Sequence, residues 1–281
     1  MVEILEAQTL AAKARDGTPM TFSYLDQGRG AALVLLHGIG SAARSFDRQI
    51  AALSATHRVV AWDAPGYGGS SDLAPPHPTA DDYAAALAVF LDALKIEACH
   101  LLGHSLGCLM AARFTVRHPE RVRALTLCSI AGGHAPLPAE ERQKLLDQRL
   151  GDVAALGPCQ MAEKRAPRLL GPAAPAEALG RVIDTMGSVR PGGYAQAARM
   201  LSTGDVKADV RRFPTTLPGQ IVYGDGDVIT PPARNQEVAA VWPTAAVHVI
   251  PGAGHALYLE QPDRFNSLLV DFLSKTTGPS S

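Results

Sequence analysis

A serine flanked by glycines is the clearest chemical signal in the chain. Residues 103–107 have the sequence Gly-His-Ser-Leu-Gly, and they lie between an apolar run at 99–102, typical of a strand, and a segment of helical period at 106–118. A serine in such a strand-to-helix turn has its hydroxyl lifted out of the sheet, and the flanking glycines avoid collisions across the turn. We therefore predict that Ser105 is a nucleophile.

Two backbone amides near this serine are candidates to hold negative charge on a substrate oxygen. The first amides of the helix after Ser105 point at the site, so we expect the N–H of Leu106 to be one donor. A second donor is expected from residues 37–40, His-Gly-Ile-Gly, because this loop follows the predicted strand 33–36 and its glycines let the backbone approach a ligand closely. We assign this second donor to the N–H of Ile39.

A serine hydroxyl is a weak nucleophile, so a general base must lie within hydrogen-bond reach. Among the nine histidines, His255 follows the sequence Pro-Gly-Ala-Gly of 251–254, between a predicted strand at 246–250 and a predicted helix at 264–273. Ligands bind open α/β sheets at the carboxyl ends of the strands, and this loop lies at such an end. The placement predicts that His255 is the base.

The other eight histidines are expected to be structural or solvated. His37 and His104 lie near the predicted site but are fixed in the loop and the turn described above, so we expect both to be structural. His100 and His248 fall within predicted strands and should face a helix or solvent. Four more fall in helices, turns or loops and are expected to be solvated surface residues: His57, His77, His118 and His134.

An acid is needed to orient the base, and two carboxylates follow an apolar run at 220–223. The sequence Gly-Asp-Gly-Asp supplies Asp225 and Asp227. A calcium loop is excluded there, because Ile229 and Thr230 stand where an oxygen ligand and a glycine are needed. The residues after another predicted strand, 130–133, are Ile-Ala-Gly-Gly and offer no carboxylate. Both aspartates therefore remain candidates at this point.

The elements that position these residues follow an α/β pattern. Apolar runs bounded by turn residues alternate with segments of helical period, which is typical of a mostly parallel sheet with helices on both faces. The predicted strands are 18–24, 33–36, 59–62, 99–102, 123–129, 220–223 and 246–250. The predicted helices are 45–53, one that begins near Thr79 and Asp82, 106–118, 232–241 and 264–273.

The sequence changes character between 134 and 212, where Pro, Gly and Ala are frequent and no β-branched run favours a strand. We predict an α/β core formed by 1–133 and 213–281, with 134–212 inserted as a helical lid over Ser105. The apolar residues of this segment are too few for an independent core, so several should face the site and form an apolar pocket for a small acyl substrate. They include Leu145, Leu146, Leu169, Leu170, Met186 and Met200.

Composition limits the partners of the protein. The chain has 281 residues, of which 47% are hydrophobic, enough for one large core. Its 26 basic residues balance 27 acidic ones without a basic run, which argues against nucleic-acid binding. Residues 1–6 carry acids where a secretory signal places positive charge, and no window approaches the roughly 18 apolar residues of a spanning helix. We expect a cytoplasmic protein with no membrane partner.

The four cysteines form no C-x-x-C pair, and three of them lie in apolar stretches. Buried free thiols are therefore expected rather than disulfides. Histidine and cysteine never cluster at metal-ligand spacing, so we assign no metal. The cysteines are Cys99, Cys108, Cys128 and Cys159.

Taken together, these motifs resemble the α/β-hydrolase superfamily over nearly the whole chain. The likeness is carried by 37–38, His-Gly; 63–70, Asp-Ala-Pro-Gly-Tyr-Gly-Gly-Ser; the Gly-His-Ser-Leu-Gly turn; 224–231, Gly-Asp-Gly-Asp-Val-Ile-Thr-Pro; and 252–255, Gly-Ala-Gly-His. The resemblance implies the chain order serine, acid, histidine. It also implies an acid three residues after a glycine and four before a proline, which selects Asp227 and makes Asp225 a turn residue.

Within that superfamily the chain looks like small, lid-bearing bacterial enzymes: enol-lactonases, carboxylesterases and C–C hydrolases of aromatic ring-cleavage products. Epoxide hydrolases and haloalkane dehalogenases place aspartate where Ser105 stands. The C–C hydrolases usually have Asn at the position of His104, and an Asn-Trp pair where this chain has Ser45 and Phe46. The resemblance thus implies hydrolysis of a small ester or lactone through an acyl-enzyme, without a cofactor.

Three alternatives stay open beside ester or lactone hydrolysis. One is C–C hydrolysis of a vinylogous diketone. A second is a non-hydrolytic lyase on the same fold, which needs a cation over the leaving group, with Lys164 and Arg190 as candidates in the predicted lid. A third is a signalling receptor that retains the triad but turns over slowly. In each case the expected partner is a small molecule, and we make no prediction of oligomeric state.

Overall fold

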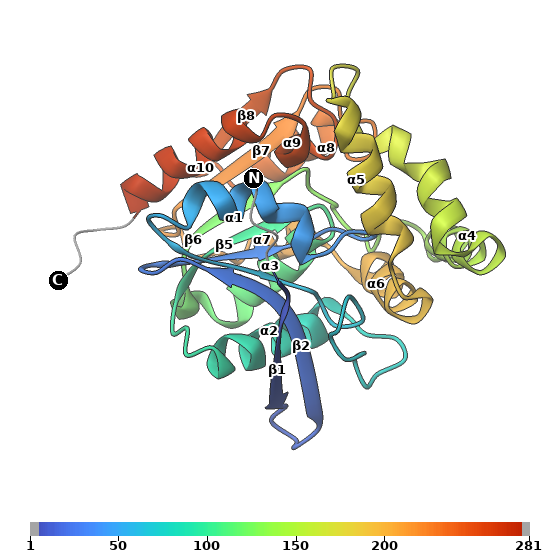
Figure 1. Ribbon diagram of the computed structural model, residues 1–281, viewed down its shortest axis with the longest axis horizontal. Coiled ribbons are helices and arrows are strands. Elements are labelled where there is room, and N and C mark those ends of the chain that lie inside the picture. The colour runs from blue at the N-terminus through green and yellow to red at the C-terminus, as the bar shows by residue number, and fades with distance from the viewer. Residues whose placement is uncertain (1–5, 277–281) are drawn as a thin grey trace.

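The computed structural model describes residues 6–276, which form an eight-stranded sheet covered by helices on both faces (Figure 1). The strand order is β1-β2-β4-β3-β5-β6-β7-β8. The first two strands pair antiparallel, and every pairing from β4 through β8 is parallel. The strands are β1 Gln8–Lys13, β2 Pro19–Gln27, β3 Ala32–Leu36, β4 Arg58–Trp62, β5 Cys99–His104, β6 Val122–Cys128, β7 Gly219–Gly224 and β8 Ala246–Ile250. The predicted α/β-hydrolase fold is confirmed.

The central strands are apolar because both of their faces are buried. In β3, Leu33 and Leu35 point into one core cluster, while Val34 and Leu36 point into the other. All seven predicted strands are present. Strand β1 was not predicted, because it is an edge strand with mostly exposed side chains and no apolar run. Its place comes from antiparallel pairing with β2, in which Leu10 lies opposite Phe22.

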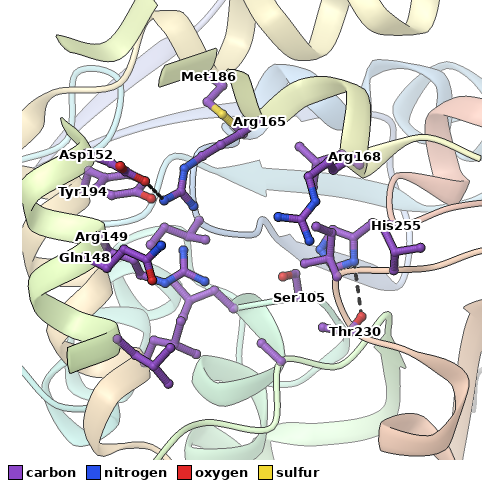
Figure 2. A pocket seen from close by; sticks show the side chains of 18 of the residues that line it. Ser105, Gln148, Arg149, Asp152, Arg165, Arg168, Met186, Tyr194, Thr230 and His255 are labelled. Atoms are coloured by element: carbon purple, nitrogen blue, oxygen red, sulfur yellow. Dashed lines mark hydrogen bonds and ion pairs between the residues drawn. The ribbon is translucent and has the colours of Figure 1, made fainter. Parts of the chain in front are cut away.

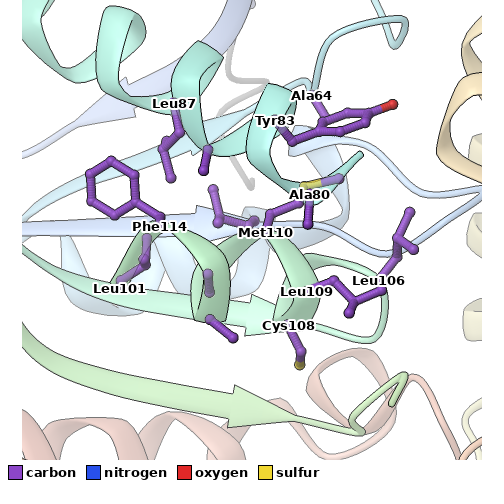
Figure 3. Close-up of a cluster of buried hydrophobic side chains, with 14 of the residues drawn as sticks. Ala64, Ala80, Tyr83, Leu87, Leu101, Leu106, Cys108, Leu109, Met110 and Phe114 are labelled. Atoms are coloured by element: carbon purple, nitrogen blue, oxygen red, sulfur yellow. The ribbon is translucent and has the colours of Figure 1, made fainter. Parts of the chain in front are cut away.

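One face of the sheet is covered by α2 (Ala80–Ala93), α3 (Gly107–Arg117) and α8 (Pro232–Ala240). Figure 3 shows Tyr83 and Leu87 of α2 packing with Met110 and Phe114 of α3 above Leu101 of β5. The N-terminus of α2 is capped as its sequence predicted, since the backbone N–H of Thr79 donates to the Asp82 carboxylate at 2.7 Å. This packing fixes α3 directly behind the predicted nucleophile.

The opposite face is covered by a short 3-10 turn η1 (Ala43–Phe46), α1 (Asp47–Leu53), α9 (Leu257–Glu260) and α10 (Pro262–Thr276). Ile50 of α1 and Leu269 of α10 both belong to the core cluster on this side. Another 3-10 turn, η2 (Pro119–Arg121), connects α3 to β6.

Between β6 and β7 the chain contains helices and no strand. They are α4 (Ala139–Arg165), the 3-10 turn η3 (Ala166–Leu169), α5 (Ala176–Gly187), α6 (Pro191–Thr203) and α7 (Val206–Val210). Helix α4 is broken at Gly157, whose backbone is non-helical (φ 68°, ψ 169°) and is followed by Pro158. Helix α4 packs on both α5 and α6, while α7 packs on α3 and α8. We call α4, η3, α5 and α6 the inserted helices; Figure 1 shows them gathered on one side of the sheet.

Within residues 6–276, no helix is both long and apolar enough to cross a membrane. Of the two N-terminal acids behind the expected cytoplasmic location, Glu3 lies outside the described residues. The same described range contains no group of three or more His, Cys, Asp or Glu side chains suited to a metal ion. All four cysteines are free thiols, and of them only Cys159 is exposed.

Candidate active site

Ser105 occupies the sharp turn between β5 and α3. Its backbone is left-handed, with φ of 53°, a conformation that costs energy in a residue with a side chain. The flanking glycines are required by space. A Cβ on Gly103 would lie 2.5 Å from the Gly107 carbonyl oxygen, and a Cβ on Gly107 would lie 2.2 Å from the oxygen of Leu36. The turn therefore presents the serine hydroxyl at the carboxyl edge of the sheet.

His255 and Asp227 form a buried hydrogen-bonded pair on two neighbouring loops. The distance from His255 Nδ1 to Asp227 Oδ2 is 2.8 Å, and the two residues are 4% and 2% exposed. A carboxylate only accepts, so Nδ1 carries the hydrogen and Nε2 of the ring is left to accept a proton. Figure 2 shows His255 beside Ser105, and both line one cavity.

Besides His255, three other donors bind the Asp227 carboxylate. Its Oδ1 accepts from the backbone amides of Ile229 and Thr230, each at 2.8 Å, and Oδ2 accepts from the Thr230 hydroxyl at 2.7 Å. Burial alone would raise the pKa of Asp227, but the hydrogen bond and charge of His255 and the bonds from Thr230 outweigh it and lower that pKa to about 2. Asp227 is therefore ionised at neutral pH. Asp225 is exposed, and it only accepts the Gly252 amide.

The loop after β3 fixes the direction of one backbone amide, that of Ile39. Nε2 of His37 accepts the N–H of Ala64 at 3.0 Å, so Nδ1 carries the hydrogen and donates to the carbonyl of Gly38 at 2.8 Å. In a trans peptide the C=O and the next N–H point in opposite directions, so the N–H of Ile39 points away from His37. Glycine fits closely at position 38, because a Cβ there would lie 3.0 Å from the Cβ of Ser105, which is tighter than ordinary contact.

The amides of Ile39 and Leu106 are the two predicted donors, and both residues line the cavity with Ser105. Throughout residues 6–276, neither amide donates to another protein group. The arrangement thus offers two unused N–H donors beside the serine. Such a pair can stabilise an oxyanion that develops during acyl transfer.

The loop after β4 supports the His37 side of this arrangement. Asp63 accepts the Ser23 hydroxyl at 2.7 Å and the Ala43 amide at 2.9 Å, and these bonds fix the turn that carries Ala64 to His37. Gly68 allows the turn to close, since a Cβ there would lie 2.3 Å from an Asp63 carboxylate oxygen. The Asp63 loop therefore acts on the site through His37.

The loop that carries His255 is fixed from two sides. His104 donates through Nε2 to the His255 carbonyl at 2.9 Å. Burial, followed by the positive charge that His255 carries when it is protonated, lowers the pKa of His104 to about 3, so that His104 stays neutral. The Glu260 carboxylate accepts the amides of Gly254 at 3.0 Å and of Gly171 at 2.8 Å. The structural roles predicted for His37 and His104 agree with these bonds.

The cavity above Ser105 has a volume of about 470 Å³ and is lined by the core loops and by α4, η3, α5 and α6. Of the six apolar residues expected to face it, Leu145, Leu169 and Met186 line it. Leu146, Leu170 and Met200 do not, and Met200 is fully buried in the core cluster instead. The expectation of an apolar pocket is incomplete, because five cationic side chains line the cavity beside the apolar ones: Arg149, Lys164, Arg165, Arg168 and Arg234.

His134 was expected on the solvated surface, and this expectation is wrong. The residue is half-buried and lines the cavity. Burial, followed by the positive charges of Arg149 and Arg234, lowers the pKa of His134 to about 4, so the ring is neutral at pH 7. Arg190, one of two cations considered for a lyase, donates to the carbonyls of Gly66 and Ser70 and is not among the residues that line the cavity.

Comparison with known proteins agrees with this geometry. The family model for the alpha/beta hydrolase fold matches residues 31–262. The chain belongs to the α/β-hydrolase family. RutD of Variovorax paradoxus, provisionally named a carbamate hydrolase, is 30% identical to this hydrolase over 266 residues, which are 93% of this chain and 98% of that one.

Two further proteins resemble this hydrolase along most of their length. A 2-hydroxy-6-oxononadienedioate/2-hydroxy-6-oxononatrienedioate hydrolase of Burkholderia vietnamiensis is 29% identical over 286 residues, covering 92% of this chain and 93% of the other. A thermophilic esterase of Thermogutta terrifontis, solved with malate bound, superposes with a TM-score of 0.88 at 25% identity, covering 97% of this chain and all of that one.

Two features of the hydrolase site were not predicted from the sequence. Thr230 contacts both Asp227 and His255, with its hydroxyl 3.2 Å from His255 Nδ1. Its position three residues after Asp227 was the available signal, since a hydroxyl at this spacing often bonds back to an aspartate side chain in a turn. The cationic lining had no such local signal, because its residues come from α4, η3 and α8.

Proposed function

We propose that this protein is a serine hydrolase that cleaves a small carboxylic ester or lactone through an acyl-enzyme on Ser105. The observation that carries the proposal is the buried Asp227–His255 hydrogen bond beside Ser105, in a cavity also lined by Ile39 and Leu106, whose amides donate to no other protein group in the described residues. A nucleophile, a base with its orienting acid, and two amide donors are the groups that acyl transfer requires.

In the proposed mechanism, the Ser105 hydroxyl attacks the substrate carbonyl while Nε2 of His255 accepts its proton. Asp227 stabilises the imidazolium that forms, and the amides of Ile39 and Leu106 bind the tetrahedral oxyanion. The protonated His255 then donates its proton to the leaving alcohol. Water, activated by the same ring, attacks the acyl-enzyme and releases the acid. Every step uses residues of this chain, so we propose no cofactor.

Ester or lactone hydrolysis is favoured over C–C hydrolysis by His104. The C–C hydrolases that the sequence resembles usually carry Asn at this position, whereas His104 here binds the His255 carbonyl at 2.9 Å and holds the loop. The name of the Burkholderia vietnamiensis relative supports C–C hydrolysis as the second candidate, and that of RutD supports a carbamate as a third. Wild-type kinetics on an ester, a lactone, a carbamate and a vinylogous diketone would rank them.

We also propose that the inserted helices act as the predicted lid, 134–212, over the core 1–133 and 213–281. Support comes from Leu145, Leu169 and Met186, which reach the cavity from three of these elements. The docking of this segment on the catalytic loop is tight. The amide of Ala256 donates to the Leu169 carbonyl at 2.9 Å, and Gly171 leaves no room for a Cβ against Gly254.

Replacing Ser105 with alanine tests the proposed function. We expect Ser105→Ala to abolish covalent labelling by a fluorophosphonate and to lower kcat on 4-nitrophenyl acetate by several orders of magnitude. Ser129→Ala is a matched control, because Ser129 is also a buried serine with φ above zero at the end of a neighbouring strand but does not line the cavity. An alanine variant at 105 that folds and keeps more than about a tenth of wild-type kcat would refute the nucleophile.

A further inference from the structure

The cavity above Ser105 carries more positive charge than ester hydrolysis by itself requires. Five cationic side chains line it, against one carboxylate, Asp152, among the lining residues. The triad uses none of the five. A small neutral ester has no group that would offset the positive charge of these side chains.

Two of the five cations are already paired. Asp152 binds Arg165 through Oδ2 at 2.5 Å and Lys164 through Oδ1 at 3.5 Å. The three residues lie on either side of the break at Gly157, so the ion pairs join the two halves of α4. Lys164 and Arg165 share this one carboxylate, and the hydrogen bond from Arg165 is the main cause that lowers the pKa of Asp152.

Three arginines remain without such a partner. In the described range 6–276, no acidic side chain forms an ion pair with Arg149, Arg168 or Arg234. Arg149 is half-buried, whereas Arg168 and Arg234 are exposed at the rim. A partly desolvated guanidinium without an anion is unfavourable, and like charges nearby add to the cost. An anion in the cavity would offset both the desolvation of the guanidinium group and the repulsion between the like charges.

The three side chains converge although they come from different elements. Arg149 belongs to α4, Arg168 to η3 and Arg234 to α8. Figure 2 shows the guanidinium groups of Arg149 and Arg168 pointing into the space beside Ser105 from opposite sides. Arg149 and Arg234 also both act on the charge state of His134, which places them at the same wall of the cavity.

We propose that the substrate of this enzyme carries an anionic group, a carboxylate or a phosphate, that Arg149, Arg168 and Arg234 bind while Ser105 attacks its ester or lactone carbonyl. Planar guanidinium forks bind either oxyanion through paired hydrogen bonds. Leu145, Leu169 and Met186 provide an apolar wall for the carbons between the two ends of the substrate. The proposal rests on the proposed function and adds the charge of the substrate to it.

The first test compares esters that differ in charge. Mono-4-nitrophenyl glutarate and 4-nitrophenyl valerate differ on the acyl side, and 4-butyryloxybenzoate and phenyl butyrate differ on the leaving side. In at least one pair we expect kcat/KM to favour the anion by about tenfold or more, as for hydrogen bonds to charged groups. This preference should fall about tenfold in Arg149→Gln and should shrink with added salt. Arg211→Gln, at an exposed arginine that does not line the cavity, should keep the wild-type ratio.

The second test measures binding without catalysis. Calorimetry of the wild-type protein with glutarate, glycerol 3-phosphate and neutral glutaramide distinguishes a carboxylate site from a phosphate site. We expect one of the two anions to bind at least tenfold more tightly than glutaramide, and Arg149→Gln, Arg168→Gln and Arg234→Gln each to weaken that binding.

The two tests separate the inference from the proposed function. If neutral esters are hydrolysed in a Ser105-dependent way but neither anionic ester is preferred and neither anion binds more tightly than glutaramide, the anion site is refuted and the esterase stands. If no ester is hydrolysed, Arg149-dependent anion binding still supports the site while the proposed function fails. A preference or affinity that Arg149→Gln leaves unchanged would also overturn the inference.

Discussion

Replacing each aspartate of the Gly-Asp-Gly-Asp loop by asparagine separates the acid of the triad from a turn residue. In Asp227→Asn the amide oxygen stays at the Oδ1 position, where the Ile229 and Thr230 amides donate to it, so the NH2 group takes the place of Oδ2 and faces His255 Nδ1 as a donor. The ring is then stabilised in the tautomer whose Nε2 carries the hydrogen, and this tautomer cannot accept the Ser105 proton. In Asp225→Asn the oxygen that accepts the Gly252 amide at 2.7 Å is retained. We expect a large loss of activity for the first change and little for the second.

The loss in Asp227→Asn should be on the order of 10³ to 10⁴ in kcat, or roughly 4 to 5.5 kcal/mol of transition-state stabilisation, as in other serine triads. KM should change less, because Asp227 is behind His255 and is not among the residues that line the cavity. Initial rates with 4-nitrophenyl acetate, corrected for active enzyme by fluorophosphonate titration, would measure both constants.

The same variant should alter stability in a pH-dependent way. The folded-state pKa of Asp227, about 2, lies below its ordinary value of 3.8, so its charge stabilises the fold above about pH 4. This contribution, about 2 kcal/mol, is lost as the pH falls through the folded-state value. Urea unfolding should therefore show Asp227→Asn less stable than the wild type at pH 7, with a difference that narrows toward pH 3.

Equal losses of kcat in Asp227→Asn and Asp225→Asn, or the larger loss in Asp225→Asn, would refute the assignment of Asp227 as the acid of the triad.

Three further predictions concern Thr230, which contacts the triad, and two methionines of the inserted helices, Met186 and Met200. Thr230→Val removes the hydroxyl that donates to Asp227 at 2.7 Å but keeps the side-chain shape, so kcat should fall about tenfold. Thr230→Ser, which keeps the hydroxyl, should retain most of the wild-type kcat. A Val variant with wild-type kcat would show that the hydroxyl is dispensable. Met186→Ala should move the chain-length optimum of 4-nitrophenyl esters from short toward longer acyl chains, because Met186 lines the cavity. Met200→Ala should leave that optimum in place and cost about 2 to 5 kcal/mol of stability, because Met200 is fully buried in the core. Wild-type activity that climbs with length up to interface-forming esters, or an optimum that moves in Met200→Ala instead, would contradict the predicted lid.

Much of the catalytic edge could be predicted because its signals are local. The left-handed backbone of Ser105 and the close approach of Gly103 to Gly107 are properties of five consecutive residues. The glycine-rich loop before His255 is equally local. The seven predicted strands are continuous apolar runs because burial on both faces leaves no alternative composition. Strand β1 was not predicted, because its side chains are mostly exposed and its place comes from pairing with β2 and contact with α2.

Local sequence was enough to predict the strand-to-helix turn at Ser105, the strand ends and, through the family resemblance, the preference for Asp227 over Asp225. The side chains that line the cavity above Ser105, by contrast, could be identified only from the tertiary structure. Arg149, Arg168 and Arg234 belong to separate elements, and their convergence depends on how α4 folds back at Gly157 and how η3 docks beside the His255 loop. Hydrophobic periodicity reports which side of a helix is buried, but it does not report which other element that helix meets. The charge of the cavity is therefore a property of packing between distant segments.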